Sequence, residues 1–384
     1  MIYVLFLLFI CTFLAYKSTN KQYAEINKQD NGFAKGTGSL STIAFVFLLL
    51  ILVCFSGLRT FGNDTTTYIS TFEDRIPNSL SAIKTIDWTI GSNPLFVVYQ
   101  IILRSVFSAN GYMFVFVSAL ITITSMVVFM RKKSYNFGFT IFIFIAFGVY
   151  MFTFAAIKQS LATAIAIWAV PLFLKKKIIR AILLILIALL IHPYVIILFA
   201  FFFLHKNIWD RRAVIIIAIT IIFGFAFTTI VESALNLTSL IGEEYSISSF
   251  EGNGINIFRI LVYWVTPILS FVYRKEIREK NDKFLNICVN LSFVSACFVI
   301  LALLGAATPL GRMANYLDIF TCIALPAVIH CDFNEAMGKK YLTFFAYAGF
   351  FVFYLSYYHK FMPDFFGNLF TDYYNHVSIM EIFR

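Results

Sequence analysis

The stretch from Gly57 to Tyr68 places a guanidinium, a Gly-Asn turn and a carboxylate directly after an apolar run, residues 41–56, that could cross a bilayer. An arginine beside hydrocarbon is costly unless it has a partner or a ligand. We therefore expect Arg59 to bind an anion in a water-filled cavity of a membrane protein. Asp64 lies four residues before Tyr68, so both would share one face of a short helix that starts at Asp64.

Other segments also carry polar side chains that suit an anionic ligand. A Lys-Gln pair opens one apolar run, a histidine precedes a proline in another, and an arginine lies four residues before a tyrosine further on. These residues are Lys158, Gln159, His192, Arg312 and Tyr316. Each has an ordinary alternative, because cations anchor helix ends, tyrosines form interfacial belts and a histidine can fill a turn. Asp64 can likewise serve as a plain helix N-cap.

The composition predicts an integral membrane protein. Of the 384 residues, 60% are hydrophobic, only 13% are charged and 47 are phenylalanine, which is more apolar surface than a soluble domain can bury. The formal net charge of +10 then reports orientation in the membrane, and we expect no nucleic-acid partner. The six cysteines have no C-x-x-C spacing, which favours apolar packing over disulfides or zinc ligation.

We expect an all-α, polytopic fold with about 12 transmembrane helices in a single transmembrane domain, residues 1–384. The run at 178–204 is broken by His192-Pro193, which favours two short helices in a hairpin with His192 at the turn. The expected outer loops are 58–93 and 232–255. The predicted spans are 2–16, 41–57, 112–130, 137–153, 157–174, the two within 178–204, 213–231, 256–273, 284–305, 312–330 and 341–358.

Residues 94–108 are too short and too polar for an ordinary span. Their apolar residues have the spacing of an amphipathic helix that lies on the membrane surface: Leu95, Tyr99, Ile102, Leu103 and Val106. We therefore expect one interfacial helix here in addition to the crossings.

The loops fix the expected orientation. Most of the 30 Lys and Arg residues fall in alternate loops, which places those loops inside and both termini outside. This topology brings all the candidate residues to the outer end of the helix bundle. Several cations and a few carboxylates at one membrane face would bind a polyanionic headgroup such as a lipid-linked pyrophosphate. No metal-ligand set, P-loop or dinucleotide motif appears, so we expect neither metal nor cofactor.

At these residues the sequence resembles the EpsG/Wzy-type polysaccharide polymerases. The matching motifs are G-L-R-x-x-G-x-D-x-x-x-Y at 57–68, Lys158-Gln159, Ile191-His192-Pro193 and Gly311-Arg312-x-x-x-Tyr316. The chain departs from the family pattern at two positions. Lys158 replaces an arginine and so keeps the charge without the bidentate fork, and Asn93 stands where the family often has a glutamate.

The resemblance implies a glycosyltransferase of the bacterial inner membrane. It would join oligosaccharide repeat units carried on undecaprenyl pyrophosphate at the periplasmic face, making O-antigen of lipopolysaccharide, capsule or exopolysaccharide. Arg59, Lys158, Gln159 and Arg312 would bind the pyrophosphate, and Tyr68 and Tyr316 would contact phosphate or sugar. Either Asp64 or His192 would act as the general base. Membrane lipid, a chain-length regulator and a flippase are the further partners implied.

Three other activities fit the same membrane class. An O-antigen ligase-like transferase would carry longer acceptor-binding outer loops. A flippase or exporter of lipid-linked oligosaccharide would show midplane charges and two repeated halves, which the sequence lacks. An acyltransferase would need a His-carboxylate pairing that is not evident.

Overall fold

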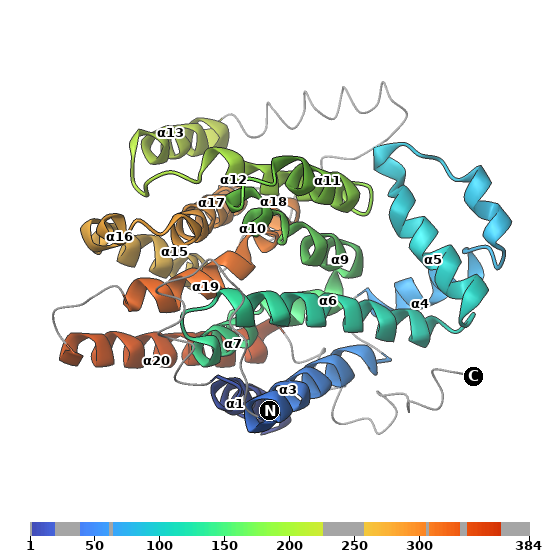
Figure 1. Cartoon of the computed structure of the whole chain (residues 1–384), viewed down its shortest axis with the longest axis horizontal. Helices are drawn as coiled ribbons and strands as arrows, with labels where there is room; N and C mark the ends of the chain where they lie inside the picture. The colour runs from blue at the N-terminus through green and yellow to red at the C-terminus, as the bar shows by residue number, and fades with distance from the viewer. Residues whose placement is uncertain are drawn as a thin grey trace. The chain divides into compact units, whose positions relative to one another are not determined.

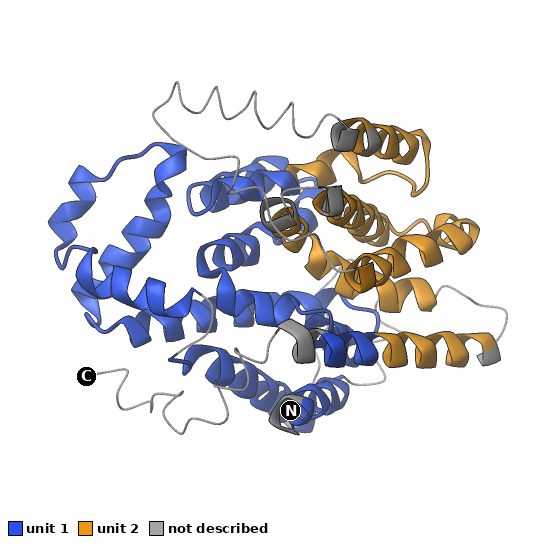
Figure 2. Cartoon of the chain, turned by 180° about the vertical axis from the view of Figure 1, so that it is seen from behind, with its two compact units in different colours: residues 1–198, 350–384 blue, residues 199–349 orange. Residues whose placement is uncertain are grey.

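A computed structural model describes residues 2–19, 39–60, 64–225, 257–304, 307–330 and 336–361, and these residues form helices and connections without a strand (Figure 1). The chain divides into two compact units, Met1–Leu198 with Phe350–Arg384, and Phe199–Gly349 (Figure 2). We call them unit 1 and unit 2. The all-α prediction is confirmed for the described residues, whereas the single transmembrane domain stays a prediction.

Unit 1 holds the first twelve described helices and most of a thirteenth, η3. They are α1 (Ile2–Lys17), α3 (Ser39–Gly57), α4 (Thr65–Asp74), η1 (Leu80–Thr85), η2 (Ile90–Ser92), α5 (Pro94–Val106), α6 (Gly111–Lys133), α7 (Phe137–Ala146), α8 (Val149–Ala155), α9 (Ile157–Ala166), α10 (Ala169–Leu174), α11 (Ile178–Leu189) and η3 (Pro193–Phe199).

Helix α6 is the centre of unit 1, where it packs against α3, α4 and α9. Its contact with α3 depends on Gly57, because a Cβ there would lie 2.8 Å from Cδ2 and 3.1 Å from Cα of Phe116. Glycine therefore lets the end of α3 approach the α6 backbone. The first residue of the G-L-R-x-x-G motif thus serves helix packing, which the spacing of the motif alone does not predict.

Two breaks shape the segment before Lys158. Gly148 separates α7 from α8 with φ of 89°, a conformation that favours glycine, and the two helices bend by 48°. The expected span at 137–153 is therefore two helices. Ala156 separates α8 from α9 with φ of −126° and ψ of 68°, so a second break lies two residues before Lys158.

Unit 2 is arranged around α17, which packs against α13, α15, α18 and α19. The helices beyond η3 are α12 (Ala200–Phe203), α13 (Arg211–Phe225), α15 (Ile257–Val272), α16 (Arg274–Lys280), α17 (Lys283–Leu304), α18 (Ala307–Asn315), α19 (Asp318–Ile329) and α20 (Ala336–Phe361), the last returning to unit 1. The expected helix at 312–330 is wrong in its bounds. It is two helices, α18 and α19, because the helix is interrupted at residues 316–317.

The number of membrane crossings differs from the expectation. Among the described residues, four helices are long and apolar enough to cross a membrane, or up to six if each bent pair forms one span. The expected 12 crossings are therefore not confirmed, because several apolar helices are only 10–17 residues long. The positions of the apolar helices nevertheless follow the expected segments closely. The predicted outer loop at 232–255 lies outside the described residues.

Candidate functional site

The start of α5 is a meeting point for several candidate residues of unit 1. The ring of Phe96 lies 6.3 Å from the Tyr68 ring, between centroids, and 5.8 Å from the Lys158 ammonium. Phe96 is buried and also contacts Phe114 of α6 and Tyr99 of its own helix. We call this group, Tyr68, Phe96, Tyr99, Phe114 and Lys158, the Phe96 cluster.

Asn93 and Pro94 begin α5 and explain one departure from the family pattern. Asn93 has φ of 56° and ψ of 53°, a left-handed conformation that asparagine tolerates better than glutamate does. Pro94 occupies the first helical position, where its fixed φ suits the helix and no hydrogen bond is lost. The asparagine therefore suits the turn that places Phe96.

The His192 turn adjoins the same end of α5. The Leu95 N–H donates to the Leu190 carbonyl at 3.0 Å, two residues before His192. His192 is half-buried, and its ring centroid lies 5.5 Å from that of Tyr194. The predicted break at His192-Pro193 is confirmed, since α11 ends at Leu189 and η3 begins at Pro193. The turn thus brings His192 close to the first residues of α5.

Asp64 and Tyr68 lie one helical turn apart, as predicted. Helix α4 begins at Thr65 with Asp64 at its N-cap, and the Tyr68 N–H donates to the Asp64 carbonyl at 3.0 Å. The Asp64 side chain does not cap the helix. That side chain is half-buried, and its proposed role in the chemistry stays a prediction.

Arg59 is almost fully buried, with 1% of its surface exposed. Its Nε donates to Thr65 Oγ1 at 2.9 Å and its Nη2 donates to the Phe154 carbonyl at 3.0 Å. Its Nη1 donates to the carbonyl of Ser56 and, at 3.4 Å, to the Ser56 hydroxyl. Its guanidinium carbon also lies 4.9 Å from the centre of the Phe154 ring. Arg59 is therefore bonded to three segments of the chain.

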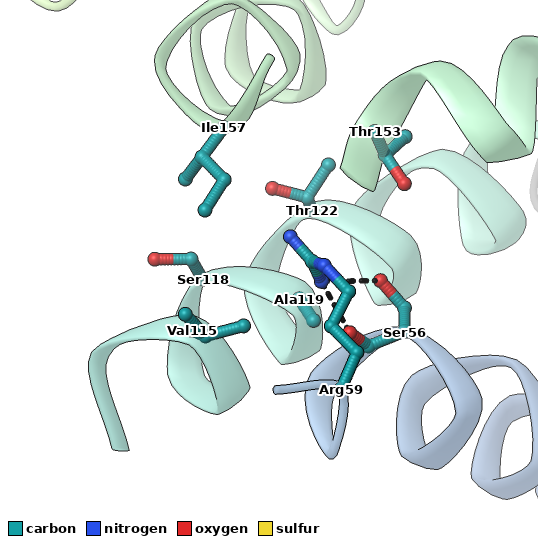
Figure 3. A pocket seen from close by; sticks show the side chains of 8 residues that line it. All are labelled: Ser56, Arg59, Val115, Ser118, Ala119, Thr122, Thr153 and Ile157. Atoms are coloured by element: carbon teal, nitrogen blue, oxygen red, sulfur yellow. Dashed lines mark hydrogen bonds between the residues drawn. The ribbon is translucent and has the colours of Figure 1, made fainter. Parts of the chain in front are cut away.

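The space around the Arg59 guanidinium is small and has a mixed polar and apolar lining. A cavity of about 10 Å³ is lined by hydroxyls of α6 and α8 together with apolar side chains (Figure 3). This volume is close to the lower limit for one water molecule. Its lining residues are Ser56, Arg59, Val115, Ser118, Ala119, Thr122, Thr153 and Ile157. Among the described residues no carboxylate lies within ion-pair distance of Arg59. Burial lowers the pKa of the guanidinium to about 9, which leaves it charged at neutral pH.

Lys158 and Gln159 face different surroundings. Lys158 is half-buried over the Phe96 ring, and in the described part of the chain no carboxylate or hydrogen-bond acceptor binds its ammonium. Gln159, with 4% of its surface exposed, lies inside unit 1. Of the cations predicted for unit 1, Lys158 is therefore the one whose charge is available to a ligand.

Arg104, a further cation on α5, has a structural position. It donates to the carbonyls of Phe72 and Glu73, in the last turn of α4, and it lies over the Phe72 ring. Cations at helix C-termini satisfy free carbonyls and complement the helix dipole. Arg104 therefore stabilises the packing of α4 against α5.

Arg312 and Tyr316 lie in unit 2. Arg312 is exposed in the last turn of α18, whereas Tyr316 lies beyond the end of that helix with 1% of its surface exposed. The two residues therefore do not share a helix face. The burial of Tyr316 does not favour direct contact with a sugar, nor a place in an exposed interfacial belt.

A buried polar network in unit 2 was not identified from the sequence. Asp318 accepts from the Tyr263 hydroxyl and from the Ser295 hydroxyl, each at 2.6 Å, and Arg259 Nη2 lies 3.3 Å from the Tyr263 oxygen. The signal was present, since an aspartate in an apolar helix needs buried partners. The network joins α15, α17 and the start of α19.

Comparison with known proteins supplies the family. A match to the EpsG family extends over residues 42–373, most of the chain. The chain belongs to the EpsG family. No curated protein and no solved structure gives a significant match. The EpsG family is associated with polysaccharide polymerisation, so this is a polysaccharide-polymerase-type membrane protein whose family implies a lipid-linked oligosaccharide substrate.

Proposed function

We propose that the chain joins oligosaccharide repeat units carried on undecaprenyl pyrophosphate at the periplasmic face of a bacterial inner membrane. The product would be O-antigen, capsule or exopolysaccharide. The observation that carries this proposal is the convergence of Lys158, Tyr68 and the His192 turn on the start of α5, within a chain of the EpsG family.

Lys158 is the group we assign to the pyrophosphate. As the glycosidic bond of the carrier breaks, negative charge develops on the leaving pyrophosphate, and a cation placed beforehand stabilises that charge. The Lys158 ammonium has no anionic partner among the described residues and is half-buried, where its field is screened less than in bulk water. Arg312 is exposed and keeps its predicted carrier-binding role as a proposal.

The attacking sugar hydroxyl must lose its proton, and His192 and Asp64 remain the two candidates for this base. Both are half-buried. His192 lies in the turn bonded to the start of α5, and Asp64 lies one turn before Tyr68 of the Phe96 cluster. Their connections to the start of α5 and to Tyr68 are what support these two assignments.

Helix α5 gives the carrier lipid a place to enter. Ile102 and Val106 are exposed on it, and Phe107 follows with 70% of its surface exposed. A short helix with one buried side and exposed apolar side chains on another is typical of a helix at the membrane interface. Figure 1 shows α5 running across the direction of α6, as expected for a helix at the end of a bundle.

Deletion of the gene tests the proposed activity. Surface polysaccharide is separated on a gel before and after deletion, with the gene restored on a plasmid as the control. A single-repeat band that regains its ladder on restoration supports the polymerase. Loss of every repeat would contradict it and would point to a flippase or a ligase.

A further inference from the structure

Arg59 lies where three helices end or begin. The Ser56 carbonyl belongs to the last turn of α3, the Phe154 carbonyl to the last turn of α8, and Thr65 to the first turn of α4. Carbonyls in the last turn of a helix have no partner within that helix, and they carry the negative end of its dipole. Two such carbonyls compensate the buried charge of Arg59 without an anionic ligand.

The bond to Phe154 links Arg59 to Lys158. In an uninterrupted helix the Phe154 carbonyl would accept from the N–H of Lys158, four residues later. The helix instead breaks at Ala156, and Arg59 Nη2 donates to that carbonyl at 3.0 Å. The guanidinium thus stabilises the broken backbone that sets the direction of the first turn of α9, on which Lys158 lies.

Direct contact between Arg59 and the carrier is not favoured by this geometry. Its Nε and both Nη atoms already donate to the protein. The adjoining cavity of about 10 Å³ has no room for a pyrophosphate. We therefore expect the influence of Arg59 on the carrier to pass through the residues that it holds.

We propose that Arg59 is a positioning residue, which holds the break between α8 and α9 so that Lys158 projects over Phe96. This inference rests on the proposed function in one respect only, that Lys158 binds the pyrophosphate of the carrier. The positioning itself is a property of the free protein, so it can be measured without substrate.

The test uses the purified full chain in lipid nanodiscs. Hydrogen exchange is measured for the backbone amides of residues 154–160, and the rate of Lys158 modification by an amine-reactive reagent is followed by mass spectrometry. Arg59→Gln is expected to raise both rates about tenfold, since charge-assisted hydrogen bonds are lost. Arg131→Gln is the matched control, because Arg131 Nη2 donates to the Ser18 carbonyl at 3.2 Å near the other end of α6. It should leave both rates unchanged.

Two further variants separate geometry from charge. Arg59→Lys keeps the charge but not the planar fork, so it is expected to behave like Arg59→Gln. Thr65→Val removes one acceptor and keeps the guanidinium, and it provides the same measurement should the Arg59 variants not fold. We expect it to raise exchange in residues 154–160 by about threefold. Unchanged rates in the variants that fold, or wild-type rates in Arg59→Lys, would overturn the proposal.

A separate measurement isolates the proposed function. Undecaprenyl pyrophosphate, added to the wild-type protein, should slow the modification of Lys158. If it does not, Lys158 is not the ligand of the carrier and the proposed function loses its main residue. The exchange result for Arg59→Gln would still test the positioning proposal independently, because it is measured without substrate.

Discussion

The Lys158 ammonium lies 5.8 Å from the centre of the Phe96 ring, at the start of α5. A cation over an aromatic face is attracted to the ring quadrupole, by about 0.5–1 kcal/mol at exposed sites and more when desolvated. This contact orders the lysine side chain without neutralising its charge. The ammonium therefore stays available to a phosphate, which is the property that the proposed chemistry needs.

Removal of the Lys158 charge should abolish polymerisation in a protein that still folds. Lys158→Gln is expected to lower turnover about 100- to 1,000-fold, as the loss of one preorganised stabilising group does in other enzymes. Lys158→Arg should keep most activity, because it restores the residue that the family usually carries. The measurement is the ladder of surface polysaccharide, supported by turnover in nanodiscs.

Lys132 provides the control for that experiment. Its ammonium lies 5.5 Å from the Trp168 ring, so it makes the same kind of contact at the other end of α6. Lys132→Gln should leave the ladder intact. A normal ladder in Lys158→Gln, at wild-type protein levels, would remove Lys158 from the mechanism.

Gly57→Ala should destabilise unit 1. The added methyl group would lie 2.8 Å from Phe116 Cδ2 and 3.1 Å from the Phe116 backbone, so α3 and α6 must move apart. Overpacking of this kind costs about 1–3 kcal/mol. Thermal unfolding in detergent micelles should show a lower midpoint. Gly349→Ala is the matched control, since no atom lies within 4 Å of its added Cβ, and it should be neutral or slightly stabilising.

The Asp318 network should couple α15 to α19 energetically. Tyr263→Phe removes the donor of the 2.6 Å hydrogen bond, and Asp318→Asn removes the charge of its acceptor. Their effects on the free energy of unfolding should therefore not add. We expect a coupling energy of about 1–3 kcal/mol in a double-mutant cycle, because the bond is buried and charge-assisted. Additive effects would show that the two side chains act independently.

The sequence predicted where the helices lie better than it predicted where an apolar segment is broken into two helices. The apolar segments, the break at His192-Pro193, the helix at Pro94 and the one-turn relation of Asp64 and Tyr68 all follow from residue spacing. The break at Gly148 did not, because an apolar run does not reveal that one of its glycines takes a positive φ. The interruption between Arg312 and Asp318 was also missed, because the residues at the break, Tyr316 and Leu317, are not helix breakers.

The surroundings of the candidate residues were the least predictable part. Arg59 donates to the Phe154 carbonyl, 95 residues later in the chain, and a local sequence pattern cannot predict such a distant partner. The sequence therefore led us to expect an anionic ligand for Arg59, whereas the structure surrounds it with protein acceptors. Lys158 differs from Arg59 in this respect. The family resemblance implies pyrophosphate binding by both residues, but in the described part of the chain only the Lys158 ammonium lacks a protein acceptor.

The identity of the base can be decided by replacing His192 and Asp64 separately. His192→Gln and Asp64→Asn keep the approximate size of each side chain and remove its ability to take a proton. Loss of a general base typically lowers the rate of the chemical step about 100- to 10,000-fold. Because neither variant removes the Lys158 cation, binding of undecaprenyl pyrophosphate should stay near the wild-type value in both.

Single-turnover rates with a lipid-linked repeat unit, measured beside carrier binding, distinguish the two candidates. The base is the residue whose replacement slows turnover without weakening binding. A variant that weakens both in proportion has instead disturbed the start of α5, to which the His192 turn is joined through the Leu95–Leu190 hydrogen bond. Wild-type turnover in both variants would exclude both residues. The sugar hydroxyl would then have to transfer its proton to another group of the chain or directly to the departing pyrophosphate.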